Sequence, residues 1–452
     1  MVRAWRRFRD GSGRAWRAEG RAALTVAAPK LRAWTPADNS TTVLFINQYY
    51  WPSHASTAQH LTDLAESLAG RGFDCHVLCS RVGPGQDRSP ALEVRNGVQI
   101  HRVGGTAFGR KNTLTRMADY LSFYAQALAK ALALPGFQVV ATLTTPPIIA
   151  LIGTLLRHLK KSKHVYWSMD LHPDASLALG RMSRRNPIVA ILIWLSDLAY
   201  RDADRVVVLG PYMEDRIAAK RVRANRLVTI PVWSRRDEIY PLPRSGNPLR
   251  SELGLDGKFV AMYSGNLGLA HCFEEFLEAA RRLKARDDVV FLYVGDGPRL
   301  EQVRRTKQAE GLDNVRIMDY FPREQLHASL SIADVHLISM RREMTGVVVP
   351  SKLYGVMAAA RPALFVGPDH CEAADTIRQA DCGTVVRLGD ADALVDALER
   401  LAADPDEARR LGDRGRAAFL ARFEREVCCA DWDRMLTALT GETITVPAPV
   451  PA

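Results

Sequence analysis

Short apolar runs alternate with segments of helical periodicity from residue 42 onward. Such runs are typical of strands buried on both faces of a parallel sheet. The segments 57–69 and 114–132 instead repeat apolar positions at helical spacing, and the first ends near Gly70 or Gly72. Strands that alternate with helices predict βαβ units and a doubly wound sheet. The strands expected in this half are 43–46, 75–79, 98–103, 139–142, 164–168 and 205–209.

Residues 231–257 interrupt this rhythm with a polar stretch rich in proline and glycine, which is typical of a linker. Beyond it the alternation restarts, with strands expected at 260–264, 289–294, 335–338 and 363–366 and helices at 391–400 and 407–423. The sequence therefore predicts an α/β protein with two tandem Rossmann-like domains facing across a cleft, at residues 41–230 and 258–425. Ligands in such folds bind at the carboxyl ends of the strands. Residues 1–40 form an N-terminal extension, and residues 426–452 a C-terminal helix and tail.

Composition excludes several classes of protein. The 452 residues are 47% hydrophobic and 25% charged, which excludes a disordered chain, a collagen-like repeat and a coiled coil. No apolar run approaches the roughly 20 residues that span a bilayer. The seven cysteines include no Cys-x-x-Cys pair, which favours a reduced, cytoplasmic chain without a zinc site, and we expect no metal.

The positive charge is concentrated at the N-terminus. Residues 1–40 hold nine Lys or Arg against three Asp or Glu, and supply +6 of the net charge of +11. Trp5, Phe8, Trp16 and Trp34 lie among these arginines. The segment is either an arm that binds an anionic membrane, a disordered leader or sequence without a role. Because the excess lies in the extension and no recognition motif follows, nucleic acid is not the expected partner.

Two apolar helices expected in the first domain have cationic ends. One carries a stripe from Ile148 to Leu159, followed by Lys160, Lys161 and Lys163. The other begins at residues 186–187, directly after three arginines. Such helices suit docking on an anionic membrane surface, although buried core helices with solvated ends have the same pattern.

Three segments of the second half suit a phosphate group. Segments 263–268 (Tyr-Ser-Gly-Asn-Leu-Gly) and 294–298 (Val-Gly-Asp-Gly-Pro) place glycine turns directly after strands, where backbone N–H groups bind anions, although ordinary turns look the same. In segment 346–354, Pro350 and Ser351 start a helix. Lys352 adds a full positive charge, which together with the helix N-terminus would neutralise a departing diphosphate. The alternative is an ordinary helix start with a solvated lysine.

Two segments of the first half suit a sugar acceptor. The loop 47–56 carries consecutive aromatic residues that would serve as platforms for a sugar ring, and its acceptor-binding candidates are Tyr50, Trp51, His54 and Thr57. The segment 167–174 places Asp170, His172 and Asp174 after a strand, where a carboxylate or imidazole would act as a base toward a hydroxyl group. The alternative is that these residues cap a helix and bond to backbone.

Taken together, these motifs resemble the GT-B glycosyltransferases, and among them the family 4 enzymes of bacterial exopolysaccharide and O-antigen assembly. The resemblance runs from residue 43 to residue 432. It rests on segments 45–52 (Phe-Ile-Asn-Gln-Tyr-Tyr-Trp-Pro), 167–174 (Trp-Ser-Met-Asp-Leu-His-Pro-Asp), 264–268 (Ser-Gly-Asn-Leu-Gly), 295–298 (Gly-Asp-Gly-Pro) and 349–354 (Val-Pro-Ser-Lys-Leu-Tyr).

The resemblance implies that the second domain binds a nucleotide-sugar donor and the first an acceptor. It implies retention of anomeric configuration, no metal, and a C-terminal helix near Trp432 that crosses back to the first domain. We expect Asp170, His172 and Lys352 to be catalytic. The donor-binding residues expected are Gly265, Asn266, Leu267, Gly268, Gly295, Gly297, Pro298, Val348, Pro350, Ser351 and Lys352.

The chain departs from the family at a pair of glutamates. The Glu-x7-Glu pattern that the resemblance implies falls near Gly346 or Val347 and on Gly355, and the nearest acid, Glu343, does not keep the spacing. The predicted function is transfer of a sugar from a UDP- or GDP-sugar to a lipid-linked or saccharide acceptor, on the inner face of the plasma membrane. The alternatives are a nucleotide-sugar epimerase and a non-catalytic partner subunit of the same fold.

Overall fold

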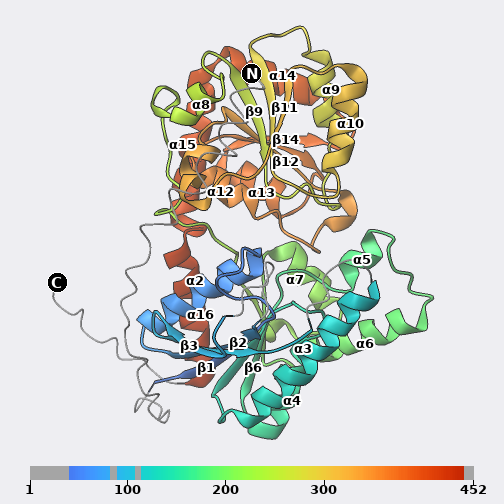
Figure 1. Ribbon diagram of the computed structural model, residues 1–452, viewed down its shortest axis with the longest axis vertical. Helices are drawn as coiled ribbons and strands as arrows, with labels where there is room; N and C mark the ends of the chain where they lie inside the picture. The colour runs from blue at the N-terminus through green and yellow to red at the C-terminus, as the bar shows by residue number, and fades with distance from the viewer. Residues whose placement is uncertain (1–39, 82–88, 107–112, 442–452) are drawn as a thin grey trace, which may run out of the picture. The chain divides into compact units, whose positions relative to one another are not determined.

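The computed structural model describes residues 40–81, 89–106 and 113–441 (Figure 1). The basic extension, apart from Ser40, and residues 442–452 lie outside the described residues, and so does any membrane arm within the extension. The described chain contains two β-sheets whose strands are parallel except at one edge of the first sheet, as the alternation of apolar runs and helices largely predicts.

The first sheet has eight strands in the order β3-β4-β2-β1-β5-β6-β7-β8. Its pairs are parallel except β3 with β4, and β1 pairs with β2 from Thr42 opposite Asp74 and with β5 from Val43 opposite Val139. The central strands are buried because helices cover both faces, which accounts for their continuous apolar runs. The strands are β1 (Thr42–Ile46), β2 (Asp74–Ser80), β3 (Leu92–Arg95), β4 (Val98–Val103), β5 (Val139–Thr142), β6 (Lys163–Trp167), β7 (Arg205–Val208) and β8 (Leu227–Thr229).

The helices of the first domain connect these strands. The side chain of Asn186 accepts a hydrogen bond from the N–H of Ile188, and Pro187 occupies the first turn, so both residues define where α6 begins. The helices are α2 (Ser56–Gly70), α3 (Thr113–Ala133), α4 (Ala150–Lys160), α5 (Asp174–Ala178), α6 (Pro187–Asp202) and α7 (Pro211–Ala218).

The second sheet has six parallel strands in the order β11-β10-β9-β12-β13-β14. They are β9 (Phe259–Ser264), β10 (Val289–Val294), β11 (Val315–Met318), β12 (Val335–Ser339), β13 (Ala363–Gly367) and β14 (Gly383–Arg387). The longer helices of this half are α9 (Glu274–Arg282), α10 (Leu300–Glu310), α13 (Glu372–Ala380), α14 (Ala391–Ala403) and α15 (Pro405–Arg422), and the shorter ones are α8 (Pro248–Glu252), α11 (Leu326–Leu330) and α12 (Lys352–Ala358).

The chain crosses from one domain to the other twice, and the two crossing segments are hydrogen-bonded to each other. The N–H of Ser234 donates to the carbonyl of Phe423, and the N–H of Arg425 donates to the carbonyl of Ser234, each at 3.1 Å. The last helix, α16 (Arg425–Thr440), then packs against α2 (Figure 1). The indole of Trp432 contacts that of Trp167 edge to face, with 4.8 Å between the ring centroids. This helix therefore completes the core of the first domain.

The strands that the hydrophobic pattern does not predict are the four edges of the two sheets: β3, β8, β11 and β14. Their residues are half-exposed rather than continuously buried, so no apolar run marks them. The segment 231–257 contains α8, whose Arg250 is buried and donates to the carbonyls of Ile332 and Leu255. A buried arginine bonded to carbonyls leaves no sign in the hydrophobic pattern.

Among the described residues, no helix is both long enough and apolar enough to cross a lipid bilayer. All seven cysteines are free and buried.

The imidazole of His164 is buried against α4. Its Nε2 lies 2.9 Å from Oγ1 of Thr142, and a Cβ atom on Gly153 would approach that nitrogen to 2.2 Å, so α4 lies directly on the ring. Burial lowers the pKa of His164 to about 4. The folded state therefore holds this ring neutral at pH values where an exposed imidazole is charged.

We expect the free energy of unfolding to fall as the pH falls from 6.5 to about 4. In this range the unfolded chain binds a proton at His164 that the folded chain does not, which destabilises the fold by up to about 1.4 kcal/mol per pH unit. Urea denaturation at pH 7.5 and pH 5 measures the difference. The variant His164→Gln should show a smaller difference, and an equal difference would contradict this account.

Candidate functional site

The two glycine turns of the second domain lie against each other. The N–H of Gly265 donates to the carbonyl of Val294 at 2.9 Å, and the N–H of Leu267 donates to the carbonyl of Asp296 at 2.9 Å. The two loops follow the adjacent strands β9 and β10, whose carboxyl ends share one edge of the sheet. The structure thus brings the donor-binding candidates of segments 265–268 and 295–298 together.

Glycine is required where these turns approach each other. Gly295 has φ +137°, and a Cβ atom there would lie 2.2 Å from the carbonyl oxygen of Gly265. Gly297 has φ +150°, and its Cβ would lie 2.6 Å from the side-chain oxygen of Asn266. Any other residue would both strain the backbone and separate the turns.

Lys352 lies against the same turn. It is the first residue of α12, after Val348, Pro350 and Ser351, and its Nζ lies 3.7 Å from the centroid of the Tyr263 ring. A Cβ atom on Gly265 would be 3.5 Å from that Nζ. The ammonium is buried, and no atom of the described residues forms a hydrogen bond with it. Burial lowers the pKa of Lys352 to about 7.

A buried ammonium without a hydrogen-bond partner is unusual, because desolvation of an unpaired charge is costly. The ring of Tyr263 stabilises the cation by a cation–π contact but leaves its N–H groups unbonded. An anion at the Gly265 turn would supply the missing bonds and the missing charge. This arrangement favours a phosphate site over the solvated lysine that the sequence leaves open.

Tyr263 and His271 lie near Lys352, and Arg341 is bonded to the residue before His271; none of the three was among the predicted site residues. Tyr263 supports Lys352, and His271 donates from Nδ1 to the carbonyl of Ser339 at 2.5 Å. Burial and the charge of Lys352 lower the pKa of His271 to about 3, which keeps the imidazole neutral. The backbone N–H of Arg341 donates to the carbonyl of Ala270 at 2.9 Å. The buried side-chain Nε of Arg341 has no hydrogen-bond partner among the described residues. All three lie at or after the carboxyl ends of central strands. Ligands in such folds bind there, so a search of these positions in the sequence would have found them.

The segment 170–172 is held from both domains. The N–H of Leu171 donates to the carbonyl of Val347 at 3.1 Å, which places this loop beside the segment that leads to Lys352. The hydroxyl of Ser196 on α6 donates to the carbonyl of His172 at 3.0 Å. Burial raises the pKa of Asp170, and nearby His172 opposes that rise. A carboxylate of raised pKa is a better base toward a hydroxyl group.

Asp174 has a structural partner. Its carboxylate pairs with Lys220 at 3.0 Å, and Lys220 also pairs with Asp197 of α6 at 3.0 Å. The carboxylate is therefore joined to α6 through Lys220, which follows α7. Of the three titratable residues of segment 167–174, Asp170 and His172 remain available for chemistry.

The aromatic loop 47–56 does not form one cluster. The ring of Tyr50 is buried in the core of the first domain, whereas His54 is exposed. Trp51 is half-buried beneath the guanidinium of Arg95, which lies 4.2 Å from its ring centroid. Thr57 lies in the first turn of α2. The structure thus separates the four acceptor-binding candidates into a core ring, a covered indole, an exposed imidazole and a helix residue.

The positions of the expected glutamate pair carry no acid. Glu343 is exposed in a short turn at Arg342–Met344. Gly355 lies in α12, where a Cβ atom would contact Leu330 at 3.6 Å and Ile239 at 3.7 Å. A side chain at position 355 would therefore start among apolar residues.

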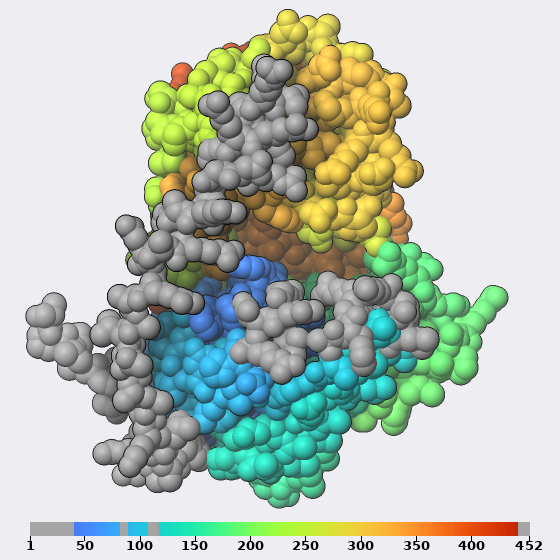
Figure 2. Space-filling view, in the orientation of Figure 1, coloured from blue at the N-terminus to red at the C-terminus, as the bar shows by residue number. Residues whose placement is uncertain are grey.

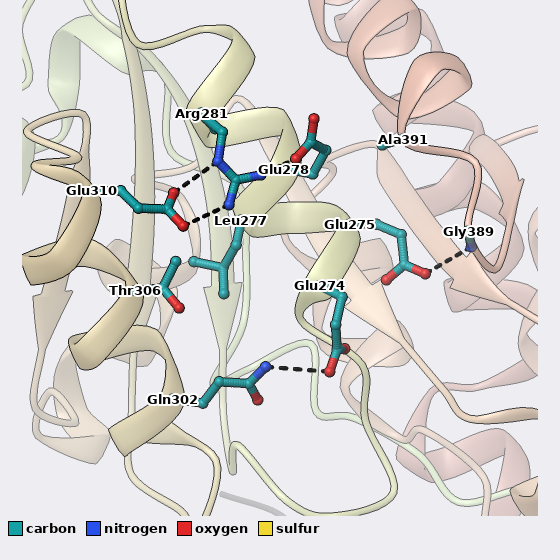
Figure 3. Close-up of a pocket in the computed structure, with 10 residues that line it drawn as sticks. All are labelled: Glu274, Glu275, Leu277, Glu278, Arg281, Gln302, Thr306, Glu310, Gly389 and Ala391. Atoms are coloured by element: carbon teal, nitrogen blue, oxygen red, sulfur yellow. Dashed lines mark hydrogen bonds and ion pairs between the residues drawn. The ribbon is translucent and has the colours of Figure 1, made fainter.

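A pocket of about 420 Å³ opens between α9 and α10 (Figure 3). Its carboxylates have partners: Glu310 accepts from Arg281, Glu274 from Gln302, and Glu275 from the N–H of Gly389. None of the predicted site residues lines it. Elsewhere in the described chain, no three His, Cys, Asp or Glu side chains gather as a metal site would require. The buried lysine at the glycine turns therefore remains the best candidate for a ligand site.

Family models match both domains. Residues 56–233 match the glycosyl transferase 4-like domain, and residues 247–418 match the glycosyl transferases group 1. The chain belongs to the GT-B glycosyltransferases. The second match contains every donor-binding candidate of this glycosyltransferase, including Lys352 and both glycine turns.

Relatives and solved structures agree with this assignment. WbjE of Pseudomonas aeruginosa, named as a glycosyltransferase, is 29% identical over 245 residues, which are 54% of this chain and 61% of WbjE. WcaI of Escherichia coli strain K12, whose name refers to colanic acid biosynthesis, is 24% identical over 340 residues, 72% of this chain and 82% of WcaI. The Anabaena protein HepE, solved with UDP-glucose, has the same fold, with a TM-score of 0.66 and 14% identity over 88% of this chain and 99% of that one.

The close approach of the two turns predicts a specific cost at position 295. We expect Gly295→Ala to lower the free energy of unfolding by about 2–4 kcal/mol, because it adds a collision with Gly265 to the strain of a positive φ. Gly389 also has a positive φ, of +87°, but no atom within 4 Å of its Cβ position. The matched variant Gly389→Ala should therefore cost only about 1–2 kcal/mol. Equal losses in urea denaturation would refute the collision.

Proposed function

We propose that this chain is a retaining glycosyltransferase that transfers a sugar from a UDP- or GDP-sugar to a lipid-linked or saccharide acceptor in the synthesis of a bacterial surface polysaccharide. The observation that carries the proposal is the buried, unpartnered ammonium of Lys352 beside the Gly265 turn. The diphosphate of a nucleotide-sugar has the charge and the acceptor oxygens that this position lacks.

Several comparisons support the choice of donor and pathway. HepE, which shares the fold, was solved with UDP-glucose and with UDP. WcaI carries a name from polysaccharide biosynthesis, and its match to this chain spans both domains. These points favour a nucleotide-sugar over a dinucleotide cofactor.

The mechanism that fits these groups is substitution on one face of the sugar. The bond between the anomeric carbon and the diphosphate oxygen breaks while the bond to the acceptor oxygen forms on the same face. The acceptor proton passes to the departing diphosphate. Lys352 and the N–H groups of segment 265–268 stabilise the charge that develops on that diphosphate. The loop at Asp170 and His172 orients the acceptor hydroxyl.

The proposal includes peripheral contact with an anionic membrane on the inner face of the plasma membrane. A lipid-linked acceptor lies at such a surface. The two apolar helices of the first domain with cationic ends, α4 and α6, support this contact.

Nucleotide binding tests the proposal directly. We expect UDP or GDP, at about 100 times its dissociation constant, to stabilise the fold by about 2.7 kcal/mol and to raise Tm by a few degrees, with ADP and NAD having no effect. The shift should shrink above pH 7, because free Lys352 then loses its proton, and it should vanish in Lys352→Ala. Absence of any shift would favour the non-catalytic partner, and binding without transfer to an added lipid acceptor would favour the epimerase.

Asp170 provides a second test. Asp170→Asn should lower kcat about 100-fold or more, since the neutral amide orients the acceptor hydroxyl less well than the carboxylate does, while the dissociation constant for UDP changes little. The exposed Asp287 of the second domain supplies the control variant Asp287→Asn, which should leave both quantities unchanged. An unaltered kcat in Asp170→Asn would remove this carboxylate from the mechanism.

A further inference from the structure

The first turn of helix α7 is hydrogen-bonded to the second domain. This helix follows strand β7 of the first domain, and the N–H of Met213 donates to Oε1 of Glu372 at 3.0 Å. The hydroxyl of Tyr212 donates to Oδ2 of Asp375 at 2.6 Å. Glu372 and Asp375 both lie in the first turn of α13, the helix that follows strand β13. The first turns of two helices, one from each domain, are therefore bonded to each other.

The two domains approach too closely at this contact to admit further side chains. A Cβ atom on Gly210, directly before α7, would lie 2.4 Å from Cγ of Glu372. A Cβ atom on Gly346 would lie 2.3 Å from the carbonyl oxygen of Tyr212. Helix α7 thus packs tightly against both α13 and the segment around residue 346.

The segment around residue 346 also contacts the loop of the first domain that carries the two candidate catalytic residues. Nε of Arg216 on α7 donates to the carbonyl of Thr345 at 2.6 Å. The N–H of Leu171, in that loop, donates to the carbonyl of Val347 at 3.1 Å. Lys352 follows in the same segment. Helix α7 and the loop therefore bind neighbouring residues of the segment that leads to the buried lysine.

Helix α5 adds a further contact between the domains. It packs against the short turn Arg342–Met344 of the second domain. The space-filling view shows green atoms of the first domain directly below orange atoms of the second (Figure 2). Helices α5 and α7 therefore both pack on the stretch that precedes Lys352.

Glu372 is buried at this contact. It is 5% exposed, and its Oε2 has no hydrogen-bond partner in the part of the chain that the structure describes. Burial raises the pKa of Glu372. The desolvation of a carboxylate offsets much of the stabilisation that its hydrogen bond provides. A buried acid between two domains is therefore better suited to fix how their surfaces meet than to stabilise either domain.

We propose that Glu372 is a positioning residue for sugar transfer: by holding the first turn of α7, it keeps the loop at Leu171 beside the segment that leads to Lys352. It acts through α7 and not on a substrate. Without its bond each domain still binds its own substrate, but the two substrates lose the alignment that transfer requires, and small displacements lower a rate steeply. The effect on transfer rests on the proposed function, whereas the effect on the domain arrangement does not.

Spin labels test the domain arrangement without requiring activity. All seven native cysteines are buried, so labels on Ala129→Cys of α3 and Gln308→Cys of α10, both exposed positions, report one distance between the domains. We expect a narrow distance distribution with native Glu372 and a broader one in Glu372→Ala. The narrow distribution should return in Glu372→Gln, because the amide oxygen still accepts a hydrogen bond from Met213.

Glu275 supplies the matched control. It lies in the first turn of α9, is 9% exposed, and accepts a hydrogen bond from the N–H of Gly389 at 2.8 Å. Like Glu372 it has an Oε2 without a partner among the described residues, but its bond stays within the second domain. Glu275→Ala should therefore lower Tm and leave the distance distribution and kcat unchanged. Equal broadening in both Ala variants, or no broadening in Glu372→Ala, would overturn the proposal.

Kinetics test the consequence for transfer. Glu372→Ala should lower kcat at least tenfold while the dissociation constant for UDP or GDP changes little, and Glu372→Gln should recover most of the kcat. Tyr212→Phe removes only the hydroxyl that bonds Asp375, so it tests the same contact with little risk to folding and should lower kcat about threefold.

Native kcat in Glu372→Ala, or a loss of nucleotide affinity as large as the loss of kcat, would overturn the positioning role. A wild-type chain that transfers no sugar would overturn the proposed function and the positioning role together. The label distances would then still decide whether Glu372 holds the two domains in this arrangement.

Discussion

Parallel strands place all their carboxyl ends at one edge of a sheet, and this constraint decides where the candidate site residues of both domains lie. The Gly265 and Gly295 turns follow neighbouring strands of the second sheet, and Asp170 follows a central strand of the first. Residues far apart in the sequence therefore reach one region because their strands are neighbours. The bond from Leu171 to Val347 joins the two edges at the point where the candidate acceptor loop meets the segment that leads to Lys352.

The energetics of Lys352 connect this geometry to the proposed function. Burial removes the ammonium from water, and the Tyr263 ring compensates only part of that loss. A pKa near 7 follows, so a modest change in environment decides whether the group is charged. A diphosphate favours the charged form, and the same interaction grows as negative charge develops on a leaving group. In the proposed reaction, one buried lysine therefore serves both binding and catalysis.

Helix α6 connects a second pair of properties. Its exposed side is apolar and follows three arginines, and its buried side is hydrogen-bonded through Ser196 to the loop that holds Asp170 and His172. A single helix thus lies between an exposed surface and the loop that carries the two candidate residues.

The sequence alone determined the two α/β domains, the central strands and the glycine turns. Buried parallel strands must be apolar throughout, and turns that approach each other closely require glycine. Both features can therefore be recognised directly in the sequence. The edge strands could not be predicted, because their half-exposed residues follow no strict hydrophobic pattern. Only the tertiary structure decided that Tyr50 belongs to the core, that Asp174 pairs with Lys220, and that Lys352 is buried beside Gly265. Each of these depends on a contact between distant segments, and hydrophobic periodicity reports burial but not the partner.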